Sequence, residues 1–378
     1  MKKRIFCLCI ACMLVFGTAF AVPGTKLGFE ALDMLYKQGE NCVISPVSLA
    51  YALAMAAQGA GGETQSELLA LLDVQEAAQV AEMQKSLTQS GLRLANAAFL
   101  TGDLIPKAEY TEALRTAFGA EWFENEGDMV GRINAWVQDH TDGMIDRLLN
   151  GPLSEDAALV LANAVAMDAK WSVPFRAENT SKGTFHAAGG DVTVDFMRQK
   201  AWFGYGERDG VQLLCKSYAG TEEDSSRLSM FIALPEAGGI PRVLEELQAE
   251  GLDYFAFEEY AREVRLVMPK MDISDDNSLA GVLTALGMET AFTPAADFSG
   301  ISDMPMRVGD VLQKARVQVD EEGTKAAAAT AVTMLDGAAM LREEPVEMIL
   351  DRPFVFLIVE EGSGGICFAG VVEDPSYN

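Results

Sequence analysis

Histidine is almost absent from this sequence, with only His140 and His186 among 378 residues. Two histidines leave little room for a histidine-rich metal site or for more than one histidine-based catalytic centre. His140 closes a polar helix end and His186 lies in a run of β-type residues, so both are interpreted as structural. The Gly-x-Ser-x-Gly motif is missing too, and residues 361–365 (EGSGG) are interpreted as a hairpin turn. We expect no enzyme activity, no metal and no cofactor.

Positive charge is scarce as well, because 29 Lys+Arg stand against 56 Asp+Glu and give a formal net charge of −27. Such a chain repels nucleic acid, anionic membrane surfaces and heparin-like polyanions, so none of these partners is expected. Apolar residues make up 49% and charged residues 22% of the chain, which indicates a folded globular protein and not a disordered one.

Long apolar runs are confined to the N-terminus. Residues 2–4 are basic, residues 5–16 are mainly apolar, and residues 19–21 (AFA) form the small-x-small pattern of a signal peptidase site. The apolar run is too short to span a bilayer comfortably, and no later run reaches ~18 residues. We expect a signal peptide, cleaved after Ala21, and a secreted or periplasmic protein. A lipoprotein attached through Cys12 is the alternative.

Cysteine is too sparse for a disulfide framework. Three of the six cysteines lie in the predicted signal peptide, which leaves Cys42, Cys215 and Cys367, odd in number and far apart in the sequence. We interpret these three as buried small apolar side chains.

Helical patterns dominate the first part of the chain and β-type segments the second. Helices are predicted at residues 27–38, 46–57, 64–72, 76–87, 107–118 and 128–139, with Ser45 as an N-cap and Thr64 opening a capping box. Strands are predicted at residues 41–44, 92–100, 157–171, 264–271, 311–319 and 354–372, and several short ones between 183 and 234. No linker or composition break appears, so this order indicates one α+β domain with large, largely antiparallel sheets.

One segment, residues 323–334 (GTKAAAATAVTM), suits two structures. Four consecutive alanines usually favour a helix. The segment nevertheless follows a predicted strand closely and is free of proline, and period two places Thr324, Ala326, Ala328 and Thr330 on one small, uncharged face. Lys325 falls on the other face. The pattern therefore suits an exposed loop and a central strand alike, and two accessible states are the physical basis of a switch.

The chain resembles the serpin family over nearly all of its length after the predicted signal peptide, in the manner of an exported, prokaryotic-type member. The motifs occur in the expected order at residues 41–55 (NCVISPVSLAYALAM), 161–175, 268–273 (MPKMDI), 297–300 (DFSG), 319–330 (VDEEGTKAAAAT) and 351–358 (DRPFVFLI). The resemblance implies a single serpin domain over residues 22–378, with about eight or nine helices, three β-sheets and an exposed reactive-centre loop at about 323–350.

The resemblance also implies a suicide inhibitor of a serine or cysteine protease. The protease cuts the loop, and the hinge side of the loop then enters the main sheet as a new strand and carries the covalently attached protease with it. The inhibitor itself is expected to be a monomer. The alternative is a non-inhibitory carrier or chaperone, but such members often have bulky residues in the hinge, and this hinge has only Lys325.

The same resemblance assigns the hinge and the cleaved bond. Gly323 supplies backbone freedom, Thr324 enters the sheet first, and the alanines remove side-chain bulk. The hinge residues are Glu321, Gly323, Thr324, Ala326, Ala327, Ala328 and Ala329. Counting from the hinge places the cleaved bond at Gly337–Ala338, which suits proteases with small or apolar pockets. Counting back from Pro353 places it near Arg342–Glu343, which suits trypsin-like proteases; we favour the first.

Polar residues beneath the sheet match the shutter, the site that in serpins holds the central strands together. Ser45, Ser48 and Asn163 fit that pattern, while Gln313 stands where the family usually has histidine. Glutamine both donates and accepts hydrogen bonds, so it can serve there. Ser45 fits a plain N-cap equally well. Trp171 matches the breach, the point where the loop enters the sheet, although a tryptophan is more often a core residue than a functional one.

Overall fold

The computed structural model describes residues 22–153, 157–220, 227–257, 261–324 and 344–376. Five predictions made above lie outside these residues: the signal peptide, the lipid attachment at Cys12, the hinge alanines and both candidate bonds. No helix of the described ranges is long and apolar enough to cross a membrane.

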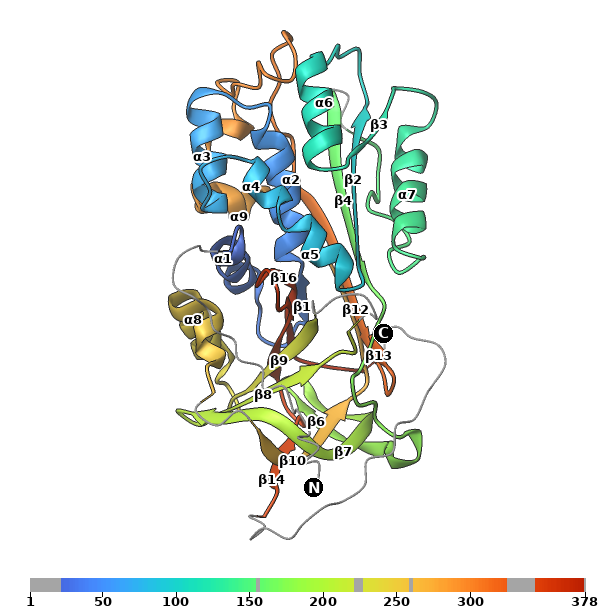
Figure 1. Ribbon diagram of the computed structural model, residues 1–378, viewed down its shortest axis with the longest axis vertical. Coiled ribbons are helices and arrows are strands. Elements are labelled where there is room, and N and C mark those ends of the chain that lie inside the picture. Colours follow the sequence, from blue (N-terminus) through green and yellow to red (C-terminus); the bar gives the residue numbers. More distant parts are fainter. Residues whose placement is uncertain (1–21, 154–156, 221–226, 258–260, 325–343, 377–378) are drawn as a thin grey trace, which may run out of the picture.

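The described residues form three sheets and a set of helices, which confirms the α+β prediction. Figure 1 shows most helices in one half of the molecule and the largest sheet in the other. The helices are α1 (Thr25–Leu35), α2 (Pro46–Ala57), α3 (Gly62–Leu72), α4 (Ala78–Ala81), α5 (Gln84–Gln89), α6 (Ala108–Ala117), α7 (Met129–His140), α8 (Ile240–Glu250) and α9 (Ala280–Ala285).

The largest sheet has nine strands in the order β1-β16-β15-β9-β8-β7-β10-β14, with β6 paired to β7. Its strands are β1 (Cys42–Ile44), β6 (Ser181–Ala187), β7 (Gly190–Arg208), β8 (Val211–Ser217), β9 (Leu228–Leu234), β10 (Arg262–Pro269), β14 (Val346–Ile349), β15 (Phe354–Glu360) and β16 (Ile366–Val372). Pairing is antiparallel apart from β10 with β14.

The other two sheets have the orders β11-β12-β13-β5 and β3-β2-β4. Their strands are β2 (Leu92–Leu100), β3 (Glu121–Phe123), β4 (Leu159–Met167), β5 (Ala169–Lys170), β11 (Met271–Ser278), β12 (Leu312–Val319) and β13 (Gly323–Thr324). Because β5 follows β4 after a single residue, the two sheets meet in one layer, with β13 between β5 and β12.

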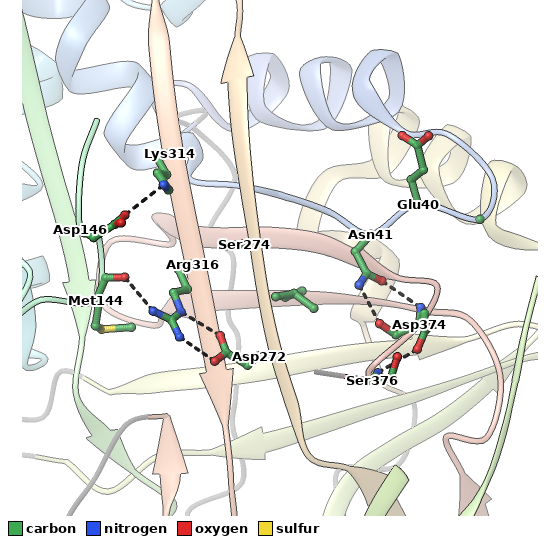
Figure 2. Close-up of a pocket in the computed structure, with 12 residues that line it drawn as sticks. Glu40, Asn41, Met144, Asp146, Asp272, Ser274, Lys314, Arg316, Asp374 and Ser376 are labelled. Carbon is green, nitrogen blue, oxygen red and sulfur yellow. Dashed lines mark hydrogen bonds and ion pairs between the residues drawn. The ribbon is translucent and has the colours of Figure 1, made fainter. Parts of the chain in front are cut away.

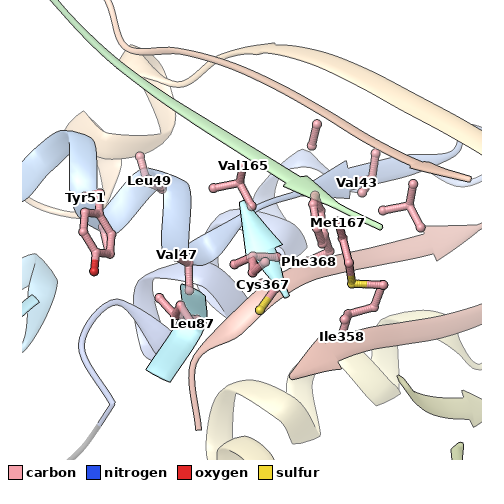
Figure 3. Packing of buried hydrophobic residues seen from close by; sticks show 14 of the residues in the cluster. Val43, Val47, Leu49, Tyr51, Leu87, Val165, Met167, Ile358, Cys367 and Phe368 are labelled. Atoms are coloured by element: carbon pink, nitrogen blue, oxygen red, sulfur yellow. The ribbon is translucent and has the colours of Figure 1, made fainter. Parts of the chain in front are cut away.

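Helix α2 anchors that layer from within. Ser45 caps it by accepting from the Ser48 N–H, and Pro46 occupies its first position, as the sequence predicts. Nearly every residue of α2 is buried, and Figure 3 shows Val47 of this helix beside Leu87 and near Cys367 of β16 in the main hydrophobic core. The helix therefore lies directly behind the strands that flank β13.

Two helix predictions are wrong in their boundaries. Helix α3 begins at Gly62 after an N-cap at Gly61, so Thr64 opens no capping box; its Oγ1 accepts from the Asp297 N–H instead. The predicted helix at residues 76–87 is divided into α4 and α5. Tertiary contacts outweigh local propensity in such short helices. Cys42, Cys215 and Cys367 are buried, as predicted.

Candidate strand-insertion site

The chain reverses direction between β12 and β13 in a tight turn at residues 320–322. The Asp320 N–H donates to the Gly323 carbonyl (2.9 Å), and Asp320 Oδ1 accepts from the backbone N–H groups of Glu322 (2.9 Å) and Gly323 (3.2 Å). Thr324 then pairs with Val319 of β12 on one side and with Ala169 of β5 on the other. The first two residues of the predicted loop therefore already lie in the sheet, and residues 346–349 near its predicted end form β14.

Gly323 is required by the close approach of β5. A Cβ atom at this position would lie 2.1 Å from the Ala169 carbonyl oxygen and 2.7 Å from Lys170 Cα, and both are backbone atoms that cannot rotate away. The sequence suggests backbone freedom as the reason for glycine here, whereas the structure gives a steric one.

Thr324 enters the core and has a buried partner. It is 1% exposed, and its Oγ1 lies 2.9 Å from the Tyr218 hydroxyl. Burial raises the pKa of Tyr218, so this hydroxyl keeps its proton at any physiological pH. Removing one of two buried, hydrogen-bonded hydroxyls leaves the other without a partner, which costs free energy. The contact therefore holds the hinge in the sheet.

Trp171 packs against the same turn. Its ring stacks on Tyr218 with centroids 4.2 Å apart, its Nε1–H donates to the Asp320 carbonyl (3.0 Å), and its backbone N–H donates to the Glu322 carbonyl (2.8 Å). Trp171 is 2% exposed. It is thus a core residue and a contact of the hinge at once.

Glu321 joins the turn to two other segments. Its Oε2 lies 2.6 Å from Lys270 Nζ, and its Oε1 accepts from the Thr180 hydroxyl (2.7 Å). Partial burial alone would raise the pKa of Glu321, but the hydrogen bonds from Lys270 and Thr180 outweigh it and hold that pKa below its usual value. No sequence motif points to either partner, because both lie far away along the chain.

The shutter residues fall into two groups. Gln313 is 5% exposed and joins β12 to the start of α2, because its Oε1 accepts from the Ser45 N–H (3.0 Å) and its Nε2 donates to the Ser45 carbonyl (2.9 Å). Asn163 bonds instead to Asn96 of β2, donating to its Oδ1 (2.7 Å). Asn163 Oδ1 is buried and has no hydrogen-bond partner in the described part of the chain. Asn96 escaped the sequence analysis because nothing marks it locally.

Beyond β13, no strand of the described ranges pairs with the facing edges of β12 and β4. Strand β4 pairs only with β2, and no ladder joins β4 to β12 within the described ranges. On the buried face, β12 contributes Ala315 and Val317, and β4 contributes Val165 and Met167. The place between them continues the line of β13, so these edges offer hydrogen bonds to one further strand.

The opposite face of β12 is tied to the chain that follows α7. Lys314 Nζ lies 3.2 Å from Asp146 Oδ1, and Arg316 donates to the Met144 carbonyl (3.2 Å) and pairs with Asp272 of β11. Figure 2 shows these contacts beside a polar cavity of about 550 Å³. A strand placed between β4 and β12 would lie next to this connection.

Comparisons with known proteins agree with one another. A family model described as "Serpin (serine protease inhibitor)" matches residues 24–375. A serpin-like protein of Thermococcus kodakarensis is 35% identical over 363 residues, which cover 92% of this chain and 84% of the relative. The native state of tengpin, a thermophilic serpin, has a TM-score of 0.81 and 28% identity over 93% of both chains. Thyroxine-binding globulin with thyroxine has a TM-score of 0.79 over 94% of this chain and 99% of that one, and its 23% identity shows the fold alone.

Proposed function

This chain belongs to the serpin family, and on that premise we propose that it inhibits a protease as a suicide substrate. Most serpins are protease inhibitors that bind target proteases, although the family also has non-inhibitory members. The observation that carries the proposal is the position of β13, which is paired on both sides at a place where, within the described residues, no further strand lies between β12 and β4.

The register of β13 gives the contacts of the strand that would follow it. Continued without a bulge, the pairs Thr324↔Val319 and Thr324↔Ala169 bring residue 326 level with Val317 and Met167, and residue 328 level with Ala315 and Val165. These neighbours are buried, so small residues fit best between them. Ala326 and Ala328 meet that demand.

Two residues further on, the same register brings Thr330 between Gln313 and Asn163. Asn163 Oδ1 is the buried acceptor without a partner described above. The hydroxyl of Thr330 can donate to it, which would relieve a cost of about 1–3 kcal/mol. Insertion would thus complete the shutter, with no histidine needed.

In the proposed reaction, the serine or cysteine nucleophile of the protease attacks the carbonyl carbon of Gly337, or of Arg342 in the alternative. The peptide C–N bond breaks, the new amino terminus leaves with a proton, and an ester or thioester links protease and inhibitor. Insertion of residues 325–337 as a strand would move the link by roughly 40 Å. This movement would drag the attached protease along and distort its active site, so the ester would no longer be hydrolysed.

The test is incubation with serine and cysteine proteases, followed by denaturing electrophoresis and sequencing of the released C-terminal peptide. We expect an adduct stable to denaturant and a peptide that begins at Ala338. A peptide that begins at Glu343 would select the alternative bond. Thr324→Arg is the matched variant, because a charged side chain cannot take the buried place of Thr324; it should be cleaved without forming an adduct. Cleavage of the wild type without any adduct would favour the non-inhibitory alternative.

A further inference from the structure

Lys216 of β8 is a buried lysine close to the hinge. It is 2% exposed, and its ammonium donates to the Val173 carbonyl (2.9 Å) and to Gln199 Oε1 (2.8 Å). No carboxylate lies within 4.0 Å of Nζ in the described ranges. An ammonium has three N–H donors, and here it meets only two neutral acceptors.

Aromatic rings enclose the remaining side of the ammonium. Nζ lies 4.6 Å from the ring centroid of Phe175, 4.8 Å from that of Trp171 and 5.5 Å from that of Phe203. Such rings attract a cation but replace only part of its hydration. Burial lowers the pKa of Lys216 to about 7. Lys216 is therefore harder to protonate in the closed site than it would be in water.

The segment that encloses Lys216 is also the one that holds the hinge. Trp171 contacts the ammonium with its ring and the Asp320 carbonyl with its Nε1–H. The backbone N–H of Phe175 donates to the Glu321 carbonyl (2.9 Å). Residues 171–175 cover one side of Lys216, and a movement that exposes the ammonium past Trp171 and Phe175 would break their bonds to the turn. Hydration of Lys216 by this route is therefore coupled to release of the hinge.

Other titratable groups around the site are few. Tyr218 keeps its proton, because burial raises its pKa. The turn that packs on Trp171 adds the carboxylates of Asp320, Glu321 and Glu322, and the hydrogen bonds from Lys270 and Thr180 hold the pKa of Glu321 below its usual value. On β7, Lys200 adjoins Gln199, but its side chain is 45% exposed and pairs with Glu263. Among the described groups at this site, Lys216 is the one whose pKa burial brings into the neutral range.

We propose that Lys216 is a positioning residue for loop insertion, and that its protonation opens the entry point beneath Trp171. The inference rests on the proposed function, since opening matters only if the loop inserts. A proton bound to Lys216 is more stable in the open, hydrated state than in the closed one, so acid favours opening and alkali favours closure. Insertion should be faster at pH 6 than at pH 9.

Native-state hydrogen exchange of residues 169–175 tests this without any protease, because the amides of Trp171 and Phe175 are bonded to the turn. After correction for intrinsic exchange, opening in the wild type should fall roughly 100-fold from pH 6 to pH 9, as linkage requires for a group that titrates near 7 closed and near 10.5 open. Lys216→Met should remove this dependence, and Lys200→Met should retain it.

Lys216→Gln provides a second neutral variant that still offers an N–H donor to Val173 and Gln199. Wild-type pH dependence in either neutral variant would overturn the proposal, as would an opening equilibrium in the wild type that does not change with pH. The proposed function is tested separately, by whether a covalent adduct forms with a protease. Loss of the adduct with the pH dependence intact would reject inhibition, while the link between protonation of Lys216 and opening of residues 171–175 would stand.

Discussion

Substitution of Gly323 by alanine tests whether the hinge must begin inside the sheet. The added methyl group would lie 2.1 Å from the Ala169 carbonyl oxygen, so β13 must separate from β5. Separation breaks the pairing of Gly323 with Lys170 and of Thr324 with Ala169, and it removes the hydrogen bond between Thr324 and Tyr218.

The magnitude follows from those losses. Each hydrogen bond contributes about 1 kcal/mol net, and a buried hydroxyl left without a partner costs about 1–3 kcal/mol. We therefore expect Gly323→Ala to lower the free energy of unfolding of the uncleaved protein by about 2–5 kcal/mol, measured by urea denaturation with circular dichroism. The yield of covalent adduct should fall as well, because the loop then starts outside the sheet.

Gly309 provides the matched control. A Cβ atom there meets nothing within 4 Å, and its backbone is not in the left-handed region. Gly309→Ala should change the free energy of unfolding by less than about 0.5 kcal/mol. Equal stability of the two variants would refute the steric account of the hinge.

Three further predictions concern acid stability, cleavage and export. The pKa of Glu321 lies below 4.5, so its carboxylate stabilises the fold above that pH, and this stabilisation is lost as the pH falls through the folded pKa. When the free energy of unfolding is measured as a function of pH, the Glu321→Gln variant should therefore lose less stability below pH 4.5 than the wild type. Loop cleavage should raise the thermal midpoint, because a new strand fills the sheet, and an unchanged midpoint in calorimetry would argue against insertion. N-terminal sequencing of protein secreted by a bacterial host should begin at Val22, whereas a lipid-modified cysteine would support the alternative.

Local features of the sequence anticipated the local features of the structure. Ser45 and Pro46 start α2 as predicted, because capping depends on neighbours within one turn. The pattern of residues 323–334 suited an exposed loop and a central strand alike; Gly323 and Thr324 lie in a strand, and the rest of the segment lies outside the described residues. The family motifs fixed the fold, because they are distributed over the whole chain.

The contacts that hold the hinge could not be read from the chain. The carboxylate of Glu321 meets Lys270 and Thr180, and Asn163 pairs with Asn96, over long separations in sequence without a motif. Thr64 is a further example, because its sequence context predicts a capping box, yet its hydroxyl oxygen accepts a hydrogen bond from the distant Asp297 N–H. Long-range pairing depends on how the sheets pack, and a local pattern carries no information about it.

By itself, the sequence determined a globular, acidic α+β chain of the serpin type with a hinge of small residues. Only the tertiary structure explains why that hinge begins with glycine: the backbone of β5 lies too close to Gly323 for a side chain to fit. The tertiary structure also shows that Lys216, which no sequence motif marks, is buried and dehydrated beneath Trp171. Solvation and steric contact belong to the packed molecule, because they depend on which distant segments come together.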